Sequence, residues 1–218
     1  MVITIDGPAG AGKSTVARGL ARRLGFEFLD TGAMYRAVAW ACLQWQIDLS
    51  DESAVVSVAA SIHLDVTENS ISCDDEDVTT AIRSTEVSRG ASIVAAIPGV
   101  RTELVRLQRS AAAGRRIVTE GRDQGSVVFP DAECKFFITA SPECRAERRL
   151  QELTERGQES DLQSVLSEII ARDERDRTRE IAPLIEPENA VTVDSSILTA
   201  DEVIASLEAV ALDRLRLS

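Results

Sequence analysis

The first fifteen residues constrain the fold more strongly than any other stretch of the chain. Residues 2–6 (VITID) form an apolar, β-branched run that predicts a buried strand, and GPAGAGKST follows directly, with a helical pattern beginning at Lys13. The glycines let successive backbone N–H groups turn towards phosphate oxygens, and the start of the helix adds partial positive charge. We therefore predict that this loop binds nucleotide phosphates, with Lys13 reaching the β- and γ-phosphates and Ser14 offering its hydroxyl to Mg²⁺. The loop residues are Gly7, Pro8, Ala9, Gly10, Ala11, Gly12, Lys13, Ser14 and Thr15.

Composition limits the classes of protein to which this chain can belong. Its 218 residues are 44% hydrophobic, which suffices for one main domain and a small appended lobe. The formal net charge of −12 argues against nucleic-acid binding, because such proteins need a basic face that displaces counterions. No run approaches the roughly eighteen apolar residues of a membrane span, and a strand beginning at residue 2 leaves no room for a signal segment. We expect a soluble, cytoplasmic protein that binds neither nucleic acid nor a membrane.

The cysteines and the single histidine exclude several kinds of site. Cys42, Cys73, Cys134 and Cys144 have no CxxC spacing, so we interpret them as thiols of a reducing cytoplasm and expect no zinc site. His63 is the only histidine, so a two-histidine metal site is impossible and a Ser-His-Asp hydrolase would depend on this residue. Because His63 lies in an alternating stretch, a structural role is the simpler interpretation.

Strand and helix patterns alternate along the rest of the chain, which predicts a parallel sheet with helices on both faces. Strands are predicted at residues 26–29, 116–120, 135–139 and 190–194, with a hairpin at 62–66 and 70–73. Helices are predicted at residues 13–24, 37–61 with a turn near 46–51, 84–113 with an interruption at 98–99, 144–156, 162–179 and 201–217.

Residues 31–113 contain helices and a hairpin but no strong parallel-strand signal, so we interpret them as a lobe inserted between core strands. Thr31 is expected to cap the helix that follows it. The acidic run at 74–77 is interpreted as a solvated turn, and the polar residues 157–161 as a mobile tip.

Two charged segments are candidates for a second binding site. Arg122 and Asp123 follow the strand at 116–120, and ligands of open α/β sheets bind outside the carboxyl ends of the strands. In the helix at 162–179, a spacing of 100° per residue predicts one face with three arginines around one carboxylate and an opposite face whose charges balance. The first face holds Arg172, Arg175, Asp176 and Arg179, and the second holds Asp173, Glu174, Arg177 and Glu180. Guanidinium groups suit phosphate oxygens, so the first face is predicted to bind an anion.

These segments together resemble bacterial cytidylate (CMP) kinases of the nucleoside monophosphate kinase group. The resemblance rests on ITIDGPAGAGKST, LDTGAMYR, TEGRDQGSVVFPDA and RDERDRTREIAPL, in that order, and covers nearly the whole chain. It implies an α/β fold, a P-loop three-layer αβα architecture with a five-stranded parallel sheet, an inserted monophosphate-binding lobe and a small lid. Residues 1–218 would form a single P-loop kinase domain. The implied parts are a core at 1–30, 114–147 and 181–218, an insert at 31–113 and a lid region at 148–180.

The resemblance also implies which residues bind CMP. They are Thr31, Tyr35, Arg36, Arg101, Arg122, Asp123, Arg172 and Asp176. Among them, Thr31, Asp123 and Arg172 contact the cytosine, Asp176 contacts the ribose, the other arginines clamp the monophosphate, and the tyrosine lines the pocket. Cytosine offers an amino donor beside two acceptors, which matches a carboxylate that accepts and a guanidinium that donates. Uracil would turn a carbonyl towards the carboxylate instead, so such a site can reject the wrong base by up to about 10⁴.

The implied catalytic residues are Lys13, Arg122 and Arg179, with Ser14 as the protein ligand of Mg²⁺. Arg148 and Arg149 are expected to belong to a lid over ATP. The implied reaction is Mg²⁺-dependent transfer of the γ-phosphoryl of ATP to the 5′-phosphate of CMP or dCMP, carried out by a monomer. No general base is needed, because a phosphate monoester is already largely dianionic at pH 7.

Other functions remain open at this point. The nearest alternative is a P-loop kinase for another small acceptor such as UMP, AMP or shikimate. A regulatory P-loop NTPase is a further alternative, although no NKxD motif of the GTPase type occurs. A nucleotide sensor without catalysis is disfavoured by the intact Lys13-Ser14 pair.

Overall fold

The computed structural model describes residues 1–155 and 157–217. By its internal contacts the chain divides into two compact units, Met1–Phe26 with Arg116–Ser218, and Glu27–Arg115.

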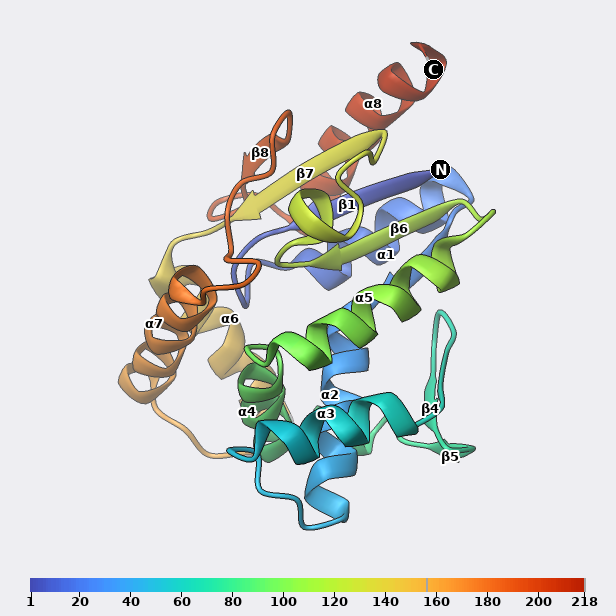
Figure 1. Ribbon diagram of the computed structural model, residues 1–218. Coiled ribbons are helices and arrows are strands. Elements are labelled where there is room, and N and C mark those ends of the chain that lie inside the picture. The colour runs from blue at the N-terminus through green and yellow to red at the C-terminus, as the bar shows by residue number, and fades with distance from the viewer. Residues whose placement is uncertain (156, 218) are drawn as a thin grey trace. The chain divides into compact units, whose positions relative to one another are not determined.

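The first unit is built on parallel strands. Its strands are β1 (Val2–Asp6), β6 (Ile117–Gly121), β7 (Cys134–Thr139) and β8 (Val191–Asp194). β1 pairs in parallel with both β6 and β7, and β7 pairs in parallel with β8, so β1 is a central strand (Figure 1). With β2 (Glu27–Asp30) at its edge, the sheet has five strands in the order β2-β6-β1-β7-β8. The predicted sheet is therefore confirmed, and the parallel registers place Asp6, Gly121, Thr139 and Asp194 at the same edge of it.

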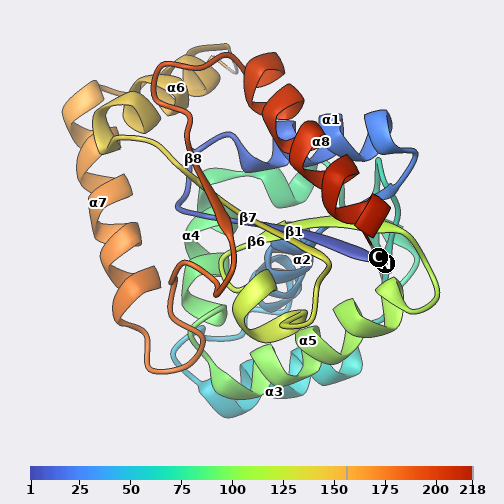
Figure 2. The same ribbon diagram turned by 90° about the horizontal axis from the view of Figure 1, so that it is seen from above.

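The helices of the first unit begin and end close to their predicted positions. They are α1 (Lys13–Leu24), the π-helical turn η2 (Gln124–Val128), α6 (Pro142–Glu155), α7 (Leu162–Thr178) and α8 (Ala200–Leu217). α1 and α8 lie side by side on one face of the sheet (Figure 2), while α6 packs against α7. The predicted end of α6 at Arg156 lies outside the described residues.

The second unit is mainly helical. Its elements after β2 are α2 (Thr31–Gln44), α3 (Glu52–Ser61), β3 (Leu64–Val66), β4 (Ile71–Cys73), β5 (Glu76–Asp77), η1 (Ala81–Arg83), α4 (Thr85–Val94) and α5 (Pro98–Ala112). Helix α2 packs against α4, and α3 packs against α5, around a core rich in alanine and valine. A Cβ on Gly90 of α4 would lie 3.3 Å from the Cβ of Ala39 on α2, so small residues let these two helices approach closely.

Two predictions in this region are wrong. Thr31 is not the helix cap, because the carboxylate of Asp30 accepts a hydrogen bond from the backbone N–H of Ala33 at 2.8 Å and Thr31 is already helical. The acidic run is not only a turn. Asp74 and Asp75 turn the chain with positive φ, but Glu76–Asp77 forms β5, which pairs with β4, so the predicted hairpin is a three-stranded sheet.

Candidate active site

The phosphate loop connects β1 to α1 in the first unit. Gly7 has a φ of 145°, and a Cβ on it would lie 1.9 Å from the carbonyl oxygen of Ile138, so only glycine fits there. Gly12 has a φ of 86° and precedes the first residue of α1, Lys13. The loop therefore turns sharply on glycines directly before a helix start, as its sequence predicts.

Lys13 is buried inside this loop. Its Nζ donates a hydrogen bond to the carbonyl oxygen of Pro8 at 2.7 Å, and the residue is only 5% exposed. The pKa of Lys13 is lowered from 10.5 to about 7, chiefly by burial and also by the positive charges of Arg122 and Arg172, against the opposing effect of the carboxylates of Glu120 and Asp6. The surroundings of Lys13 therefore favour binding of an anionic group such as a phosphate.

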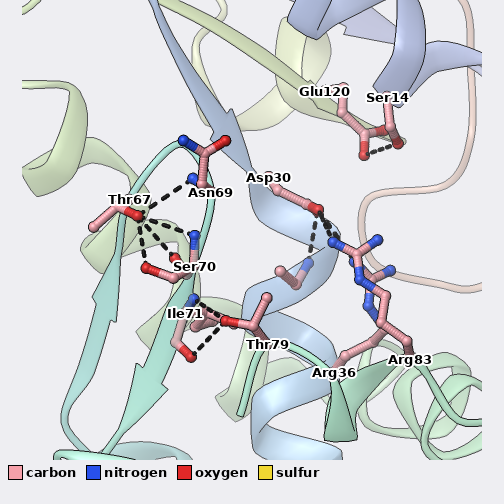
Figure 3. Close-up of polar contacts among 11 residues, drawn as sticks. Ser14, Asp30, Arg36, Thr67, Asn69, Ser70, Ile71, Thr79, Arg83 and Glu120 are labelled. Atoms are coloured by element: carbon pink, nitrogen blue, oxygen red, sulfur yellow. Dashed lines mark hydrogen bonds and ion pairs between the residues drawn. The ribbon is translucent and has the colours of Figure 1, made fainter. Parts of the chain in front are cut away.

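Ser14 and Glu120 meet beside the loop. The hydroxyl of Ser14, on the first turn of α1, donates to Oε1 of Glu120 at 2.9 Å, and Glu120 comes from the carboxyl end of β6 (Figure 3). Hydroxyl and carboxylate oxygens are the hard ligands that Mg²⁺ accepts. Across residues 1–155 and 157–217, no group of three or more His, Cys, Asp or Glu side chains could hold a metal ion.

Asp6 links the phosphate loop to the turn that follows β6. Its two carboxylate oxygens accept hydrogen bonds from the backbone N–H groups of Gln124 at 2.8 Å and Gly125 at 2.7 Å. These bonds hold the segment that carries Arg122 and Asp123. Asp6 is fully buried, and burial raises its pKa from 3.8 to about 7 against the opposing effect of these hydrogen bonds. Asp6 was not among the predicted site residues, although its place at the carboxyl end of a central strand was a signal.

We expect the Asp6→Asn variant to change how stability depends on pH. The folded-state pKa of Asp6, about 7, lies above its ordinary value of 3.8. The stabilisation from its proton is therefore fully present below pH 3.8 and is lost as the pH rises through 7. The wild-type free energy of unfolding, minus that of the variant, should fall by on the order of 4 kcal/mol across this window.

Urea denaturation at successive pH values measures this difference. The exposed Asp131 serves as the matched control, because its replacement by asparagine should leave the pH profile unchanged. A difference between wild type and Asp6→Asn that stays constant from acid to neutral pH would contradict the assignment.

Four of the predicted acceptor and catalytic residues come together next to this turn. Nε of Arg122 pairs with Oδ2 of Asp176 at 3.0 Å, and Arg179 lies 3.7 Å from the carboxylate of Asp123. Burial alone would raise the pKa of Asp176, but Arg122 and then Arg172 outweigh it, so the pKa lies below its ordinary value. The first unit thus gathers Arg122, Asp123, Asp176 and Arg179 into one network of buried charges, with Arg172 in electrostatic range.

The predicted charge faces of α7 are wrong in part. Asp173 was placed on the face whose charges were expected to balance one another, but it is 7% exposed and pairs with Arg145 of α6 at 2.7 Å. Arg175 was placed on the anion-binding face, but it is exposed. Arg179 follows the end of the helix, where its Nε donates to the carbonyl oxygen of Ala182 at 2.5 Å. Helical spacing alone did not show that α6 covers the side of α7 on which Asp173 lies.

The other predicted acceptor residues lie in the second unit, around the start of α2. Thr31 opens this helix and is buried, and Arg36 pairs with Asp30 at 3.3 Å. Arg83, which the sequence analysis missed, lies 3.5 Å from the same carboxylate (Figure 3).

Arg101 and Tyr35 also meet in this unit. The guanidinium of Arg101 lies 5.7 Å from the centre of the Tyr35 ring and donates to the carbonyl oxygen of Ala95 at 3.1 Å. The second unit therefore holds three arginines near an aromatic ring and a helix N-terminus, a chemistry suited to an anion.

Arg148 and Arg149 contact other protein groups in this structure. Arg148 donates to the hydroxyl oxygen of Ser195 at 3.2 Å and to its carbonyl oxygen at 2.5 Å. Arg149 forms an exposed ion pair with Glu152 at 3.0 Å. Their predicted contact with ATP stays a prediction.

The cysteines, the histidine and the helix lengths were also the subject of predictions. All four cysteines are free thiols, three of them buried, and His63 is exposed. Burial raises the pKa of Cys42 and of Cys73 to about 11, so both are protonated, unreactive thiols at neutral pH. No helix among the described residues is long and apolar enough to cross a membrane.

Comparison with known proteins identifies the family. The sequence model of the cytidylate kinase family matches residues 3–211. A cytidylate kinase of Clostridioides difficile is 44% identical, over 94% of this chain and 94% of its own length. One of Caldanaerobacter subterraneus is 48% identical, over 93% of this chain and 90% of its own length.

Solved structures confirm the P-loop αβα fold that was predicted. A gluconokinase of Sinorhizobium meliloti superposes with a TM-score of 0.52 at 17% identity, covering 99% of this chain and 94% of its own. A shikimate kinase of Bacteroides thetaiotaomicron gives a TM-score of 0.51 at 11% identity, covering 97% of this chain and 98% of its own. The fold is shared with these kinases of other small molecules, whereas the sequence match places the chain in one family: it belongs to the cytidylate kinases.

Proposed function

We propose that this protein transfers the γ-phosphoryl group of ATP to the 5′-phosphate of CMP or dCMP, producing ADP and CDP or dCDP. The observation that carries the proposal is the network of Arg122, Asp123, Asp176 and Arg179, joined through Asp6 to the phosphate loop. The proposed donor and acceptor residues both follow strands that end at the carboxyl edge of one sheet. Membership of the cytidylate kinases supports the same reaction.

Each buried group has a task in this reaction. Lys13, with the N–H groups of the loop, neutralises the β- and γ-phosphates of ATP. Arg122 and Arg179 face the charge that develops on the transferring phosphoryl group, and Asp176 keeps the guanidinium of Arg122 in place at 3.0 Å. No side chain needs to remove a proton, because the acceptor phosphate is already ionised, and this fits a chain whose only histidine is exposed.

Asp123, with Arg172, is the proposed reader of the base. The carboxylate of Asp123 accepts from the cytosine amino group, and the guanidinium of Arg172 donates to the acceptors beside it. Asp176 binds the ribose. In the second unit, Arg36 and Arg101 are the proposed clamps of the acceptor monophosphate, Thr31 is a proposed cytosine contact, and Tyr35 is proposed to line the pocket.

Mg²⁺ fits the Ser14–Glu120 pair, where a hydroxyl and a carboxylate oxygen lie 2.9 Å apart. Bound there with ATP, the ion would neutralise charge on the β- and γ-phosphates. Ser14 would be its direct protein ligand, and Glu120 would orient the shell through water.

We expect Ser14→Ala to raise the Mg²⁺ concentration for half-maximal activity by about tenfold, and Glu120→Gln to do the same, because groups around a metal typically contribute this much to its affinity. Mg²⁺ titration of the ADP-release rate at saturating ATP measures it. Ser164→Ala, which removes an exposed hydroxyl at the start of α7, is the matched control and should leave the titration unchanged. An unchanged Mg²⁺ requirement in both test variants would show that the pair does not serve the metal.

The lid, the oligomeric state and the location belong to the same proposal. Residues 148–180 close over ATP and exclude water, so that the phosphoryl group reaches the acceptor and not the solvent. The enzyme acts as a cytoplasmic monomer, and its four free thiols support a reducing compartment.

A coupled ADP-release assay with CMP, dCMP, UMP and AMP tests the function. We expect turnover with CMP and dCMP to exceed that with UMP and AMP by orders of magnitude. Equal turnover of UMP and CMP would contradict the assignment of the base site. ATP hydrolysis that no acceptor stimulates would favour a regulatory NTPase instead.

A further inference from the structure

Arg145 is a buried arginine to which the proposed reaction gives no role. It lies in the first turns of α6, is 3% exposed, and donates through all three of its guanidinium nitrogens. Nε donates to the carbonyl oxygen of Ala140 at 2.9 Å, one terminal nitrogen donates to the carbonyl oxygen of Ala9 at 3.1 Å, and the other pairs with Asp173 at 2.7 Å. A single side chain therefore connects the phosphate loop, the end of β7 and helix α7.

The contact with Ala9 sets the direction of a peptide group in the phosphate loop. In a planar trans peptide, the carbonyl of one residue and the N–H of the next point in opposite directions. Because Arg145 holds the carbonyl of Ala9 towards α6, the N–H of Gly10 points away from α6. Gly10 is also in contact with α6, since a Cβ on it would lie 3.2 Å from the Cβ of Arg145. Arg145 thus fixes both the position of this peptide and the direction of its donor.

Ser195 makes a similar contact two peptides further along the loop, at the carbonyl of Ala11. Its hydroxyl is buried, lies 3.1 Å from the carbonyl oxygens of both Ala11 and Thr139, and accepts a hydrogen bond from Arg148. By the same peptide geometry, a bond to the carbonyl of Ala11 turns the N–H of Gly12 away from Ser195. Alternate carbonyls of the loop are therefore within reach of buried donors on its outer side.

Asp173 connects this support to the helix that carries the proposed acceptor residues. It is one residue from Arg172 and three from Asp176 on α7, and its carboxylate fixes the guanidinium that holds Ala9. Because both side chains are buried, either charge would be costly without the other, so the two residues depend on each other.

We propose that Arg145 is a positioning residue for the phosphate loop, that it aims the N–H of Gly10 at the nucleotide phosphates, and that Asp173 acts through it. The inference rests on the proposed function only in assigning the loop to ATP. It adds a residue outside the loop whose guanidinium never touches the substrate and yet sets the affinity of the loop for phosphate.

Direct binding measurements test this without any acceptor. We expect Arg145→Lys to weaken binding of a fluorescent ADP analogue about tenfold, the effect of one well-placed hydrogen bond, because an ammonium cannot make all three contacts. Inorganic tripolyphosphate, which displaces the analogue through phosphate contacts alone, should lose affinity by the same factor. Asp173→Asn should weaken binding about threefold, and the double variant should bind no worse than Arg145→Lys alone.

Controls separate positioning from a general loss of structure. Arg23→Gln removes a more exposed, ion-paired arginine in the last turn of α1, bonded to Glu208 at 3.0 Å, and should leave both affinities unchanged. If Arg145→Lys does not fold, the neutral pair Arg145→Gln with Asp173→Asn leaves no unpaired buried charge and should show the same loss. Ser195→Ala provides an independent test of carbonyl support, with an expected loss of about threefold.

Two results would overturn the proposal. Unchanged affinity of folded Arg145 variants for ADP and tripolyphosphate would show that the loop keeps its orientation without Arg145. Losses that add fully in the double variant would show that Asp173 does not act through Arg145. Because neither measurement contains CMP, failure of the acceptor assignment would leave these outcomes untouched.

Discussion

Replacing Lys13 by methionine is expected to lower kcat by about 10³-fold while leaving the fold intact. The ammonium of Lys13 is the only lysine charge in the phosphate loop, and it lies in a buried site where a charge acts more strongly than in water. Removing one preorganised donor from such a site typically costs about 10² to 10³ in rate. Methionine preserves the apolar stem that packs inside the loop. Lys135→Met, which replaces the only other lysine of the chain, is the matched control and should leave kcat unchanged.

The same residue predicts proton uptake when nucleotide binds. With a pKa of about 7, most Lys13 side chains are neutral at pH 8 in the empty protein. The phosphates of ADP raise this pKa, so Lys13 takes up a proton on binding, and the uptake approaches one proton between pH 8 and 9. Below pH 6 the side chain is already charged and the uptake disappears.

Calorimetric titration with ADP in two buffers of different ionisation enthalpy measures this proton. The difference between wild type and Lys13→Met isolates the contribution of Lys13 from those of the nucleotide. Equal uptake by both proteins at pH 8 would show that Lys13 is charged before the nucleotide arrives. A kcat of the methionine variant within tenfold of wild type would separately contradict its catalytic role.

Local patterns were sufficient to predict most of the fold. The helix at residues 13–24 has the predicted bounds, because glycines flank it and its apolar residues recur at helical spacing. The interruption at Pro98 is likewise found at the first turn of α5. Asp30 and Thr31 are two adjacent short polar residues, and either could cap the helix that follows. The pattern along the chain does not show which of them is the N-cap. The carboxylate of Asp30 also pairs with Arg36 and Arg83, and these contacts depend on the folded unit.

Candidate site residues could be predicted where they belong to a short sequence motif. Residues whose side chains hold other residues in place could not be predicted in this way. The phosphate loop and the Arg122-Asp123 pair follow strands whose carboxyl ends meet at one edge, so sequence order was enough. The roles of Asp6 and Arg145 depend on partners that are distant in sequence: Gly125 for the first and Asp173 for the second. From sequence alone, a charged side chain on an amphipathic helix is expected to face solvent. Its burial can be predicted only when the element that packs over it is known. For this reason the burial of Asp173 and its pairing with Arg145 were not predicted.

The proposed preference for cytosine depends on Asp123, so Asp123→Ala is expected to remove it. Asp123 is 4% exposed, and its carboxylate lies 3.7 Å from the guanidinium of Arg179, so it is a fixed, largely desolvated acceptor. A buried acceptor left facing the carbonyl of uracil is costly, which is how such a site rejects UMP. Without the carboxylate, kcat/KM for CMP should fall by about 10³, while that for UMP should change little. The ratio of the two should therefore approach one.

The measurement is kcat/KM for CMP and UMP in wild type, Asp123→Ala and Asp123→Asn. Asparagine keeps the shape of aspartate but offers an amide donor to the uracil carbonyl, so it should favour UMP relative to CMP more than alanine does. Asp131→Ala, at an exposed position of the same connection between β6 and β7, should retain the wild-type ratio. Affinity for ADP should be the same in all four proteins, because the donor loop is unchanged, and this equality separates loss of base recognition from loss of fold. If Asp123→Ala retains the preference for CMP, another residue reads the base, and the role proposed for the buried network beside Asp6 would have to be limited to phosphate binding.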